Sequence, residues 1–390
     1  MEPTADLSGL VQEHNIRVFN EKEEIEDIIS SLIAERVIGD EPIFVVDIGR
    51  VKAVYEQWVE FLPNVVPHFA VKSNSDQVII KTLALLGCNF DCASHGEISS
   101  VLEHASPERI VFAHPVKDCA TLSYAREKDI DLLTFDSSCE LLKIALYHPN
   151  AELLMRLRVD DTGSTCRFGE KFGATTDEIL GLLELAQTLS LKIAGFSFHV
   201  GSGCKNVELY KKAVMACLEA MKLAGPTANI VDIGGGFSLD TFATFAAELH
   251  PFLQTIEGIK FIAEPGRLLV ETCATLVVSV IGKKKIKVAE ETQFVYHLNE
   301  SVYGIFNNKI FDFKKIKLEP FNEREAPLFK SKCYGRTCDS IDCIQEECFL
   351  PDLAVGERLF VRQQGAYTTA SSSSGFNGFE LPKTVYVLTL

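Results

Sequence analysis

No stretch of this sequence contains the roughly 18 consecutive apolar residues that a membrane-spanning helix needs. The N-terminal segment MEPTADLSGL is acidic and lacks the apolar core of a secretory signal peptide. These absences argue against a membrane protein and against a secreted one. We therefore expect the protein to be cytoplasmic.

Positive charge is also scarce. The 390 residues include 38 Lys and Arg against 54 Asp and Glu, which gives a formal net charge of −16. Nucleic-acid binding needs a basic face that neutralises phosphates, so we expect no nucleic-acid partner. The sequence is 47% hydrophobic, which is enough for a large buried core, and its length favours two domains over one.

The twelve cysteines do not form a recognisable metal site. Cys333, Cys338, Cys343 and Cys348 recur every five residues, whereas structural zinc sites usually group their ligands into two close pairs. Free thiols are the usual state of cysteines in a reducing compartment. We therefore expect free thiols and no metal ion.

Short apolar runs alternate with amphipathic stretches between residues 40 and 270. The amphipathic stretches, such as SDQVIIKTLALLG, repeat apolar residues at intervals of three and four, which is typical of helices. This pattern predicts eight strand–helix units in a closed α/β barrel, although an open doubly wound sheet would give a similar periodicity. A further strand and helix at 42–62 would lead into the barrel. The eight apolar runs are 65–72, 89–94, 109–114, 131–136, 152–159, 192–200, 229–236 and 260–266.

The pattern changes near residue 270. Four later segments are rich in strand-forming residues, and no long helical pattern separates them. A short segment near the N-terminus, 16–20, has the same character. We expect a second, all-β domain made of residues 1–39 and 271–390, beside a barrel of residues 40–270. The four later segments are 273–288, 292–298, 357–363 and 384–390.

Polar residues follow the apolar runs, at the strand ends where barrel enzymes carry out their chemistry. Lys72 is the clearest case, because it closes the apolar run VVPHFAVK. A lysine in apolar surroundings has a lowered pKa and can react with an aldehyde. The candidate residues at this end are Lys72, Asp91, Glu97, Arg156, His199, Ser202, Gly234, Gly235, Gly236, Glu264, Gly266 and Arg267.

These residues could hold pyridoxal phosphate. That cofactor needs a lysine for its aldehyde, a cradle for its phosphate and an acidic partner for its pyridine nitrogen. The glycines 234–236, with Ser202 and Arg267, would form the cradle, although a triple glycine alone is equally typical of a tight turn. Glu264 would keep the ring nitrogen protonated. His199 could stack on the ring, or it could be an ordinary hydrogen-bonded core histidine.

Seven motifs resemble the eukaryotic-type ornithine decarboxylases: FAVKSN, FDCASHGE, FSFHVGSG, DIGGGF, EPGR, YGRTCDSID and GAYTTASSSSGFNGF. The resemblance runs from about residue 15 to the C-terminus and keeps the order of the motifs. It implies an alanine-racemase-like barrel with a β domain and pyridoxal 5'-phosphate as cofactor. It also implies decarboxylation of L-ornithine to putrescine, the first step of polyamine biosynthesis, by a homodimer with shared active sites.

The resemblance assigns further roles. Cys338 and Asp339 match a pair that reaches into the neighbouring subunit's site, where Cys338 would return a proton to the substrate. Asp312 matches a second acid that binds the distal amine of the substrate. Arg336 and Phe311 depart from the proline and tyrosine usual at these positions. Lys72, His199 and Glu264 match the aldehyde-binding lysine, the ring-stacking histidine and the pyridine partner; Ser202, Gly236, Arg267 and Tyr367 match phosphate contacts; Asp91, Glu97 and Arg156 match polar residues around the cofactor.

Two alternatives remain open at this point. The first is a lysine or arginine decarboxylase of the same family, since one methylene is worth only about 1–3 kcal/mol of discrimination. The second is a non-catalytic regulator similar to the antizyme inhibitors. Such proteins usually lose cofactor contacts, whereas every contact residue named above is present. An antizyme-type regulator could also bind the enzyme as a partner.

Overall fold

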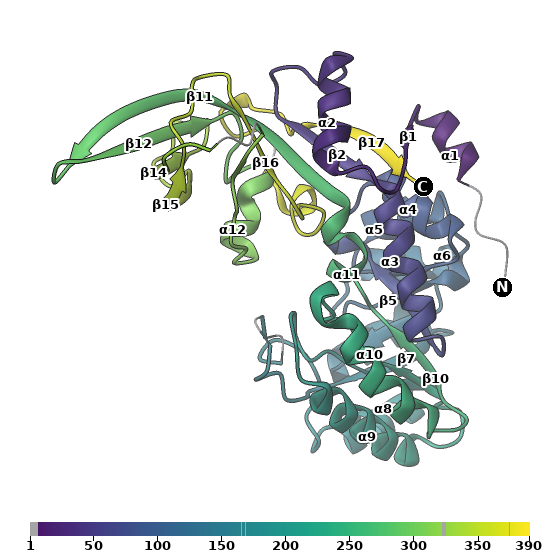
Figure 1. The fold of residues 1–390 in the computed structure, drawn as a ribbon. Helices are drawn as coiled ribbons and strands as arrows, with labels where there is room; N and C mark the ends of the chain where they lie inside the picture. The colour runs from purple at the N-terminus through teal and green to yellow at the C-terminus, as the bar shows by residue number, and fades with distance from the viewer. Residues whose placement is uncertain (1–6, 165, 168, 322–324, 374) are drawn as a thin grey trace. The chain divides into compact units, whose positions relative to one another are not determined.

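The computed structural model describes residues 7–164, 166–167, 169–321, 325–373 and 375–390 (Figure 1). The chain divides into two compact units. One contains Lys52–Leu269, and the other combines Leu7–Val51 with Val270–Leu390. Each unit has its own sheet and its own buried core. Within the described residues, no helix is both long and apolar enough to cross a membrane.

The first unit is a closed barrel of parallel strands in the order β10-β3-β4-β5-β6-β7-β8-β9. The predicted barrel is confirmed, because each strand lies within one of the eight apolar runs. The open-sheet alternative is wrong, since β10 pairs with β3 and closes the ring. The strands are β3 (Val65–Ala70), β4 (Asn89–Cys92), β5 (Ile110–Phe112), β6 (Leu132–Phe135), β7 (Glu152–Leu157), β8 (Lys192–Phe198), β9 (Ile230–Asp232) and β10 (Lys260–Ala263).

Side-chain caps set the starts of several barrel helices. Asp76, Ser94, Asp118 and Ser137 each accept a hydrogen bond from a backbone N–H in the first turn of the helix that follows. These caps fix where the loops after the strands end, and so they help to position the polar side chains there. The helices are α3 (Ile48–Phe61), α4 (Gln77–Leu85), α5 (His95–Leu102), α6 (Cys119–Glu127), α7 (Ser138–Tyr147), α8 (Ile179–Thr188), α9 (Val207–Ala224), α10 (Leu239–Gln254) and α11 (Arg267–Val270).

Apolar side chains from several strands form one buried cluster in the barrel unit. Its members are Val111, Ala113, Leu154, Ala194, Ile230 and Ile262. A barrel of this kind is a packed core rather than a pore. The polar chemistry is therefore confined to the strand ends.

The second unit is a mixed sheet in the order β1-β17-β2-β11-β12-β14-β15, with β16 pairing β11 and β13. The predicted β-rich second domain is thus present, and β11 and β12 form the long hairpin seen in Figure 1. The elements are β1 (Arg17–Phe19), β2 (Ile43–Asp47), β11 (Ala274–Val288), β12 (Glu291–Leu298), β13 (Glu319–Pro320), β14 (Phe329–Tyr334), β15 (Cys343–Leu350), β16 (Arg358–Val361) and β17 (Lys383–Thr389), with α1 (Ser8–Glu13), α2 (Ile25–Ala34) and α12 (Asn308–Phe311).

The strand and helix predicted at 42–62 are present as β2 and α3, but β2 belongs to the second unit and not to the predicted barrel domain. In that unit, β2 lies between β17 and β11 in the sheet. All five residues of β2 are buried, and a strand buried on both faces reads the same in sequence whichever sheet it joins. Residues 40–51 therefore group with the second unit, and the barrel unit begins at Lys52.

Candidate active site

Lys72 lies just beyond β3, and its ammonium group contacts Asp91 of β4. Ala70 and Asp91 are opposite each other in these parallel strands, and a short 3-10 turn (Val71–Ser73) then carries Lys72 past the strand end. Nζ of Lys72 is 2.5 Å from Oδ2 of Asp91. The Asp91 side chain is fully buried, whereas that of Lys72 is 44% exposed. The amine is thus balanced by a buried charge and still open to a reactant.

The loop after β9 is free of side chains where it approaches the loop after β8. Gly234 and Gly236 have φ angles of 66° and 102°, which residues with a Cβ rarely adopt. A Cβ on Gly234 would collide with the carbonyl oxygen of Phe198, and one on Gly236 with that of Gly201. A bare loop of this kind lets backbone N–H groups approach an anion closely. It fits the predicted phosphate cradle.

Glu264 follows β10 and interacts with a second buried carboxyl group, Asp232 at the end of β9. Burial raises the pKa of Glu264 well above its usual range, the charges of Asp232 and Asp91 raise it further, and Lys72 opposes them. Burial also raises the pKa of Asp232 to about 6, although its Oδ1 accepts the N–H of Gly234 at 2.8 Å. Neighbouring buried carboxyl groups resist double ionisation. A positive charge bound beside Glu264 would relieve that repulsion.

His199 is a neutral, half-buried imidazole after β8. Burial lowers its pKa well below the usual value, and the charges of Arg156 and Lys72 lower it further. Nδ1 of His199 accepts the N–H of Gly201 at 2.9 Å, so the ring proton is on Nε2. A neutral ring of fixed orientation can stack on a flat ligand without adding charge.

Arg156 and Glu97 complete the charged groups at this end of the barrel. Burial lowers the pKa of Arg156, while the carboxylates of Glu264 and Asp136 favour its charged form. Glu97 lies in the first turn of α5, and its Oε2 accepts the N–H of Ala93 at 2.6 Å. Burial raises the pKa of Glu97, an effect that this hydrogen bond opposes.

The remaining barrel candidates take part in loop packing. The backbone N–H of Ser202 donates to the carbonyl of Cys166 at 2.9 Å, which ties the loop after β8 to the loop after β7. Gly266 packs so closely on Ser73 that an added Cβ would lie 3.0 Å from the Cβ of that serine. Arg267 is the first residue of α11.

Four candidate residues belong to the sheet unit. Cys338 is exposed, and its N–H donates to Oδ1 of Asn377 at 3.0 Å. Oδ2 of Asp339 accepts the Tyr303 hydroxyl, and this hydrogen bond lowers the pKa of Asp339. Asp312 caps the C-terminus of α12. Tyr367 has a φ of 54°, which is uncommon for a residue with a side chain.

Sequence reasoning passed over Asp232, Tyr210 and Tyr303. Asp232 is the last residue of β9, so the rule that polar residues at strand ends form the site also predicts it. The Tyr210 hydroxyl donates to the carbonyl of Gly235 at 2.6 Å and supports the glycine loop. No sequence signal marks Tyr210 or Tyr303, because their contacts join segments far apart in the chain.

The four evenly spaced cysteines do not form one cluster. Sγ of Cys333 and Sγ of Cys348 are 3.7 Å apart across β14 and β15, while Cys338 lies on the exposed loop between these strands. Among the residues that the structure describes, no group of three or more His, Cys, Asp or Glu could hold a metal ion.

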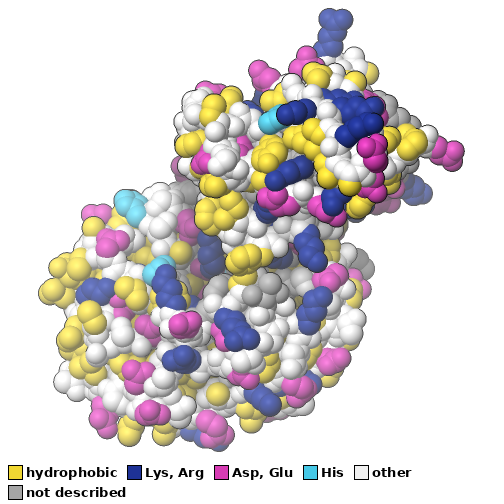
Figure 2. All heavy atoms as spheres, turned by 90° about the vertical axis from the view of Figure 1, so that its left-hand side faces the viewer, with side chains coloured by type: hydrophobic (Ala, Val, Ile, Leu, Met, Phe, Trp, Pro, Cys, Tyr) yellow, Lys and Arg dark blue, Asp and Glu magenta, His cyan; other side chains and the backbone are white. Residues whose placement is uncertain are grey.

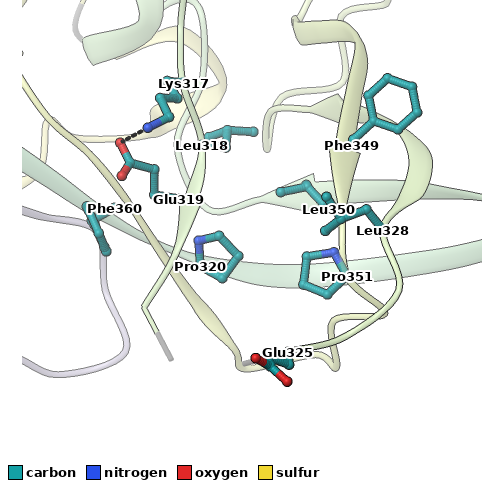
Figure 3. A pocket seen from close by; sticks show the side chains of 10 residues that line it. All are labelled: Lys317, Leu318, Glu319, Pro320, Glu325, Leu328, Phe349, Leu350, Pro351 and Phe360. Atoms are coloured by element: carbon teal, nitrogen blue, oxygen red, sulfur yellow. Dashed lines mark ion pairs between the residues drawn. The ribbon is translucent and has the colours of Figure 1, made fainter. Parts of the chain in front are cut away.

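A separate pocket of about 570 Å³ lies in the sheet unit (Figure 3). Leu328, Leu350 and Pro351 face Pro320 and Phe360 across it. An ion pair between Lys317 and Glu319, with 3.3 Å between Nζ and Oε1, borders it. None of the candidate site residues lines this pocket.

The residues at the barrel end fit pyridoxal phosphate. They provide an amine at Lys72, a bare glycine loop for the phosphate and a half-buried acid, Glu264, for a protonated ring nitrogen. Oδ1 of Asp91 is buried and has no hydrogen-bond partner among the described residues. A bound group with polar substituents could satisfy that oxygen.

Comparison with known proteins gives a consistent result. The family described as "Pyridoxal-dependent decarboxylase, pyridoxal binding domain" matches residues 48–271. The "Probable ornithine decarboxylase" of Dictyostelium discoideum is 39% identical over 385 residues, covering 93% of this chain and 82% of that protein. "Antizyme inhibitor 2" of Xenopus laevis is 36% identical over 407 residues, covering 98% of this chain and 89% of that protein.

Solved structures share the fold along nearly the whole chain. The Paramecium bursaria Chlorella virus arginine decarboxylase bound to agmatine has a TM-score of 0.88 at 36% identity, covering 93% of this chain and all of that one. The Vibrio vulnificus lysine/ornithine decarboxylase complexed with putrescine has a TM-score of 0.83 at 30% identity, covering 93% of this chain and 98% of that one.

Proposed function

Because this chain belongs to the pyridoxal-dependent decarboxylase family that includes the eukaryotic-type ornithine decarboxylases, we propose that it converts L-ornithine to putrescine and carbon dioxide. It is a pyridoxal-phosphate-dependent amino-acid decarboxylase. The observation that carries the proposal is that the amine of Lys72, paired with Asp91, lies at the same end of the barrel as the acid Glu264 and the bare glycine loop.

Pyridoxal phosphate, when bound, supplies a ring that accepts the electron pair left behind by the departing carboxylate. Lys72 would hold the cofactor through its aldehyde group. The glycine loop 234–236, with Ser202 and Arg267, would hold the phosphate. Glu264 would keep the ring nitrogen protonated, and neutral His199 would stack on the ring. Asp91 stabilises the ammonium of Lys72 through their 2.5 Å contact.

The sheet unit supplies the groups that act on the substrate. The exposed thiol of Cys338 returns a proton to the Cα atom after the carboxylate leaves. Asp339 is held in its charged form by Tyr303, so it can pair with the distal ammonium group, and Asp312 provides a second carboxylate for the same group. Tyr367 adds a hydroxyl for the phosphate. Two carboxylates bind an amino acid with a second ammonium group better than one with an uncharged side chain.

Lysine and arginine remain the rival substrates. The structural similarity to a viral arginine decarboxylase favours testing arginine, and the similarity to a lysine/ornithine decarboxylase favours testing lysine. Carbon dioxide release should be measured with ornithine, lysine and arginine side by side on one preparation. Ornithine should give the highest kcat/KM, and a higher value for either rival would contradict the assignment.

A non-catalytic regulator is the rival from another class, because an antizyme inhibitor is 36% identical to this chain. The intact set of Lys72, His199, Glu264 and Cys338 disfavours it. The purified protein should be yellow from bound cofactor and should lose that colour with hydroxylamine, which removes the aldehyde. A colourless protein that still binds an antizyme would support the regulator.

A head-to-tail homodimer is the assembly that the proposal requires. The sheet unit exposes Phe311, Phe313 and Ile341, which are 69%, 71% and 60% exposed. Figure 2 shows hydrophobic side chains beside Lys and Arg on the upper part of the molecule. Exposed apolar side chains such as these are typical of a protein–protein interface. Sedimentation should therefore give a dimer.

A further inference from the structure

Arg336 lies two residues before Cys338, and its guanidinium group is held within the sheet unit. Its side chain is 13% exposed. One nitrogen, Nη2, donates to the carbonyl oxygen of Glu380 at 2.7 Å and is 3.6 Å from Oε2 of Glu300. The guanidinium carbon is 4.5 Å from the ring centroid of Phe379. These three partners engage the cation, so it is not a free positive charge that would repel an amine substrate.

Glu300 is a fully buried carboxylate. Its Oε1 accepts the N–H groups of Ser301 at 2.8 Å and Ile305 at 3.3 Å, which fixes the carboxylate against the turn that it begins. A Cβ on Gly304 would collide with Oε1, so the turn admits the carboxylate only because residue 304 is glycine. Oε2 makes no hydrogen bond within the described residues, and Arg336 is the cation paired with it.

The contacts around Arg336 join three segments that are distant in sequence. Glu300 and Tyr303 belong to the first, Arg336 and Asp339 to the second, and residues 376–380 to the third. Tyr303 donates to Asp339 and stacks on Phe376 with 4.0 Å between the ring centroids. The N–H of Cys338 donates to Asn377 of the third segment at 3.0 Å. Arg336 contacts the first segment through Glu300 and the third through the carbonyl oxygen of Glu380, so one side chain joins both.

We propose that Arg336 is a positioning residue that holds Cys338 and Asp339 in place by pairing with Glu300 and by packing on the 376–380 segment. The proposal rests on the function proposed above, in which Cys338 and Asp339 act on the substrate. Removing a buried partner leaves an uncompensated carboxylate, and that costs far more than an exposed pair does. The loop would then move relative to the 300–304 turn, and both reactive groups would move with it.

The pairing of Arg336 with Glu300 and its packing on residues 376–380 are called the clamp. Four variants test it: Arg336→Gln, Arg336→Lys, Glu300→Gln and the double variant Arg336→Gln/Glu300→Gln. Arg358→Gln is the matched control, because Arg358 pairs in the same unit with the exposed Asp40 at 3.5 Å. Two measurements are made on each holoenzyme. One is the kcat and KM for ornithine, and the other is the rate at which iodoacetamide alkylates Cys338, read by peptide mass spectrometry.

Arg336→Gln should lower kcat about tenfold or more and raise the ornithine KM, since displacing a reactive group by about 1 Å costs up to 100-fold. The alkylation rate of Cys338 should rise about threefold, while cofactor absorbance stays at the wild-type level. Arg336→Lys should recover part of kcat. The double variant should be more stable than Arg336→Gln, because no buried charge is left unpaired, yet its Cys338 should still alkylate faster than wild type.

Alkylation makes this test independent of the proposed substrate. If the wild-type protein decarboxylates none of the three amino acids, the proposed function fails, but the alkylation rates still report on the loop. If the alkylation rate and the kinetic constants of Arg336→Gln or of the double variant equal those of Arg358→Gln, the clamp is wrong. Should Arg336→Gln fail to fold, the double variant decides by the same criterion.

Discussion

The ammonium group of Lys72 and the carboxylate of Asp91 are 2.5 Å apart at the ends of two adjacent barrel strands, and the carboxylate is fully buried. A buried carboxylate is tolerated when a countercharge lies at hand. Lys72 therefore has two roles, one as the reactive amine and the other as the cation paired with buried Asp91. Replacing Lys72 tests both roles, and different substitutions separate them.

Lys72→Ala should abolish most of the activity and also lower stability, by about 1–3 kcal/mol, because Asp91 loses its partner. Lys72→Arg is the matched control: it keeps the charge, so it should restore the melting temperature, but a guanidinium cannot replace the amine and activity should stay low. Thermal unfolding and carbon dioxide release measure the two effects. In the wild type, borohydride should attach the cofactor to Lys72, and a label on another lysine would refute the assignment.

Glu264→Gln should leave the cofactor bound and lower kcat on the order of tenfold or more, with a smaller change in KM, because the charge matters most in the transition state. Burial raises the pKa of Glu264 and the charge of Asp232 raises it further, so the same change removes one of two carboxyl groups that repel each other. The melting temperature should therefore not fall. Glu184→Gln, at an exposed position of α8, is the control. If Glu264→Gln keeps the wild-type kcat, Glu264 does not protonate the ring nitrogen of the cofactor.

Glu300 should make stability depend on pH. Burial raises the pKa of Glu300 to about 7 from an ordinary value of 4.5, opposed by the N–H of Ser301 and by Arg336, while Asp342 adds to the rise. The folded state then binds the proton more tightly than the unfolded chain does, so wild type should lose stability as the pH rises from about 4.5 to about 7. The loss relative to Glu300→Gln should reach about 3 kcal/mol and then level off.

Urea unfolding of wild type and Glu300→Gln at several pH values across this range measures that loss. The difference between the two proteins should change with pH below about 7 and be constant above it. Parallel stability curves would show that Glu300 has the same proton affinity in both states and would contradict the raised pKa.

Mixing Lys72→Ala with Cys338→Ala should restore activity if the active site is shared between subunits. Random exchange makes half of the dimers mixed, and each mixed dimer has one site with both defects and one with neither. Activity should therefore recover to roughly a quarter of wild type. The dimers must first be dissociated in mild salt and reassembled. If the mixture has only the mean activity of the two single variants, Cys338 does not belong to the shared active site.

Much of the barrel and of its chemistry could be predicted from the sequence. Eight apolar runs matched eight strands because a parallel barrel strand buries both faces and leaves a continuous apolar signature. Lys72, Asp91 and Glu264 were found because barrel strands end at one rim, so position along the run implies position in space. Asp232 follows the same rule, because it is the last residue of β9.

The sequence by itself predicted the barrel and the cofactor of this protein from local pattern and strand order. It also proposed the reactive residues, those of the barrel from strand order and Cys338 from the family resemblance. The tertiary structure alone decided that β2 joins the sheet, because a fully buried strand does not indicate its partners. It also decided what Arg336 does. In the sequence, Arg336 is a cation two residues before Cys338. In the fold, its guanidinium group lies beside the carboxylate of Glu300 and the ring of Phe379. Contacts between segments so far apart in the chain form only when the sheet unit packs.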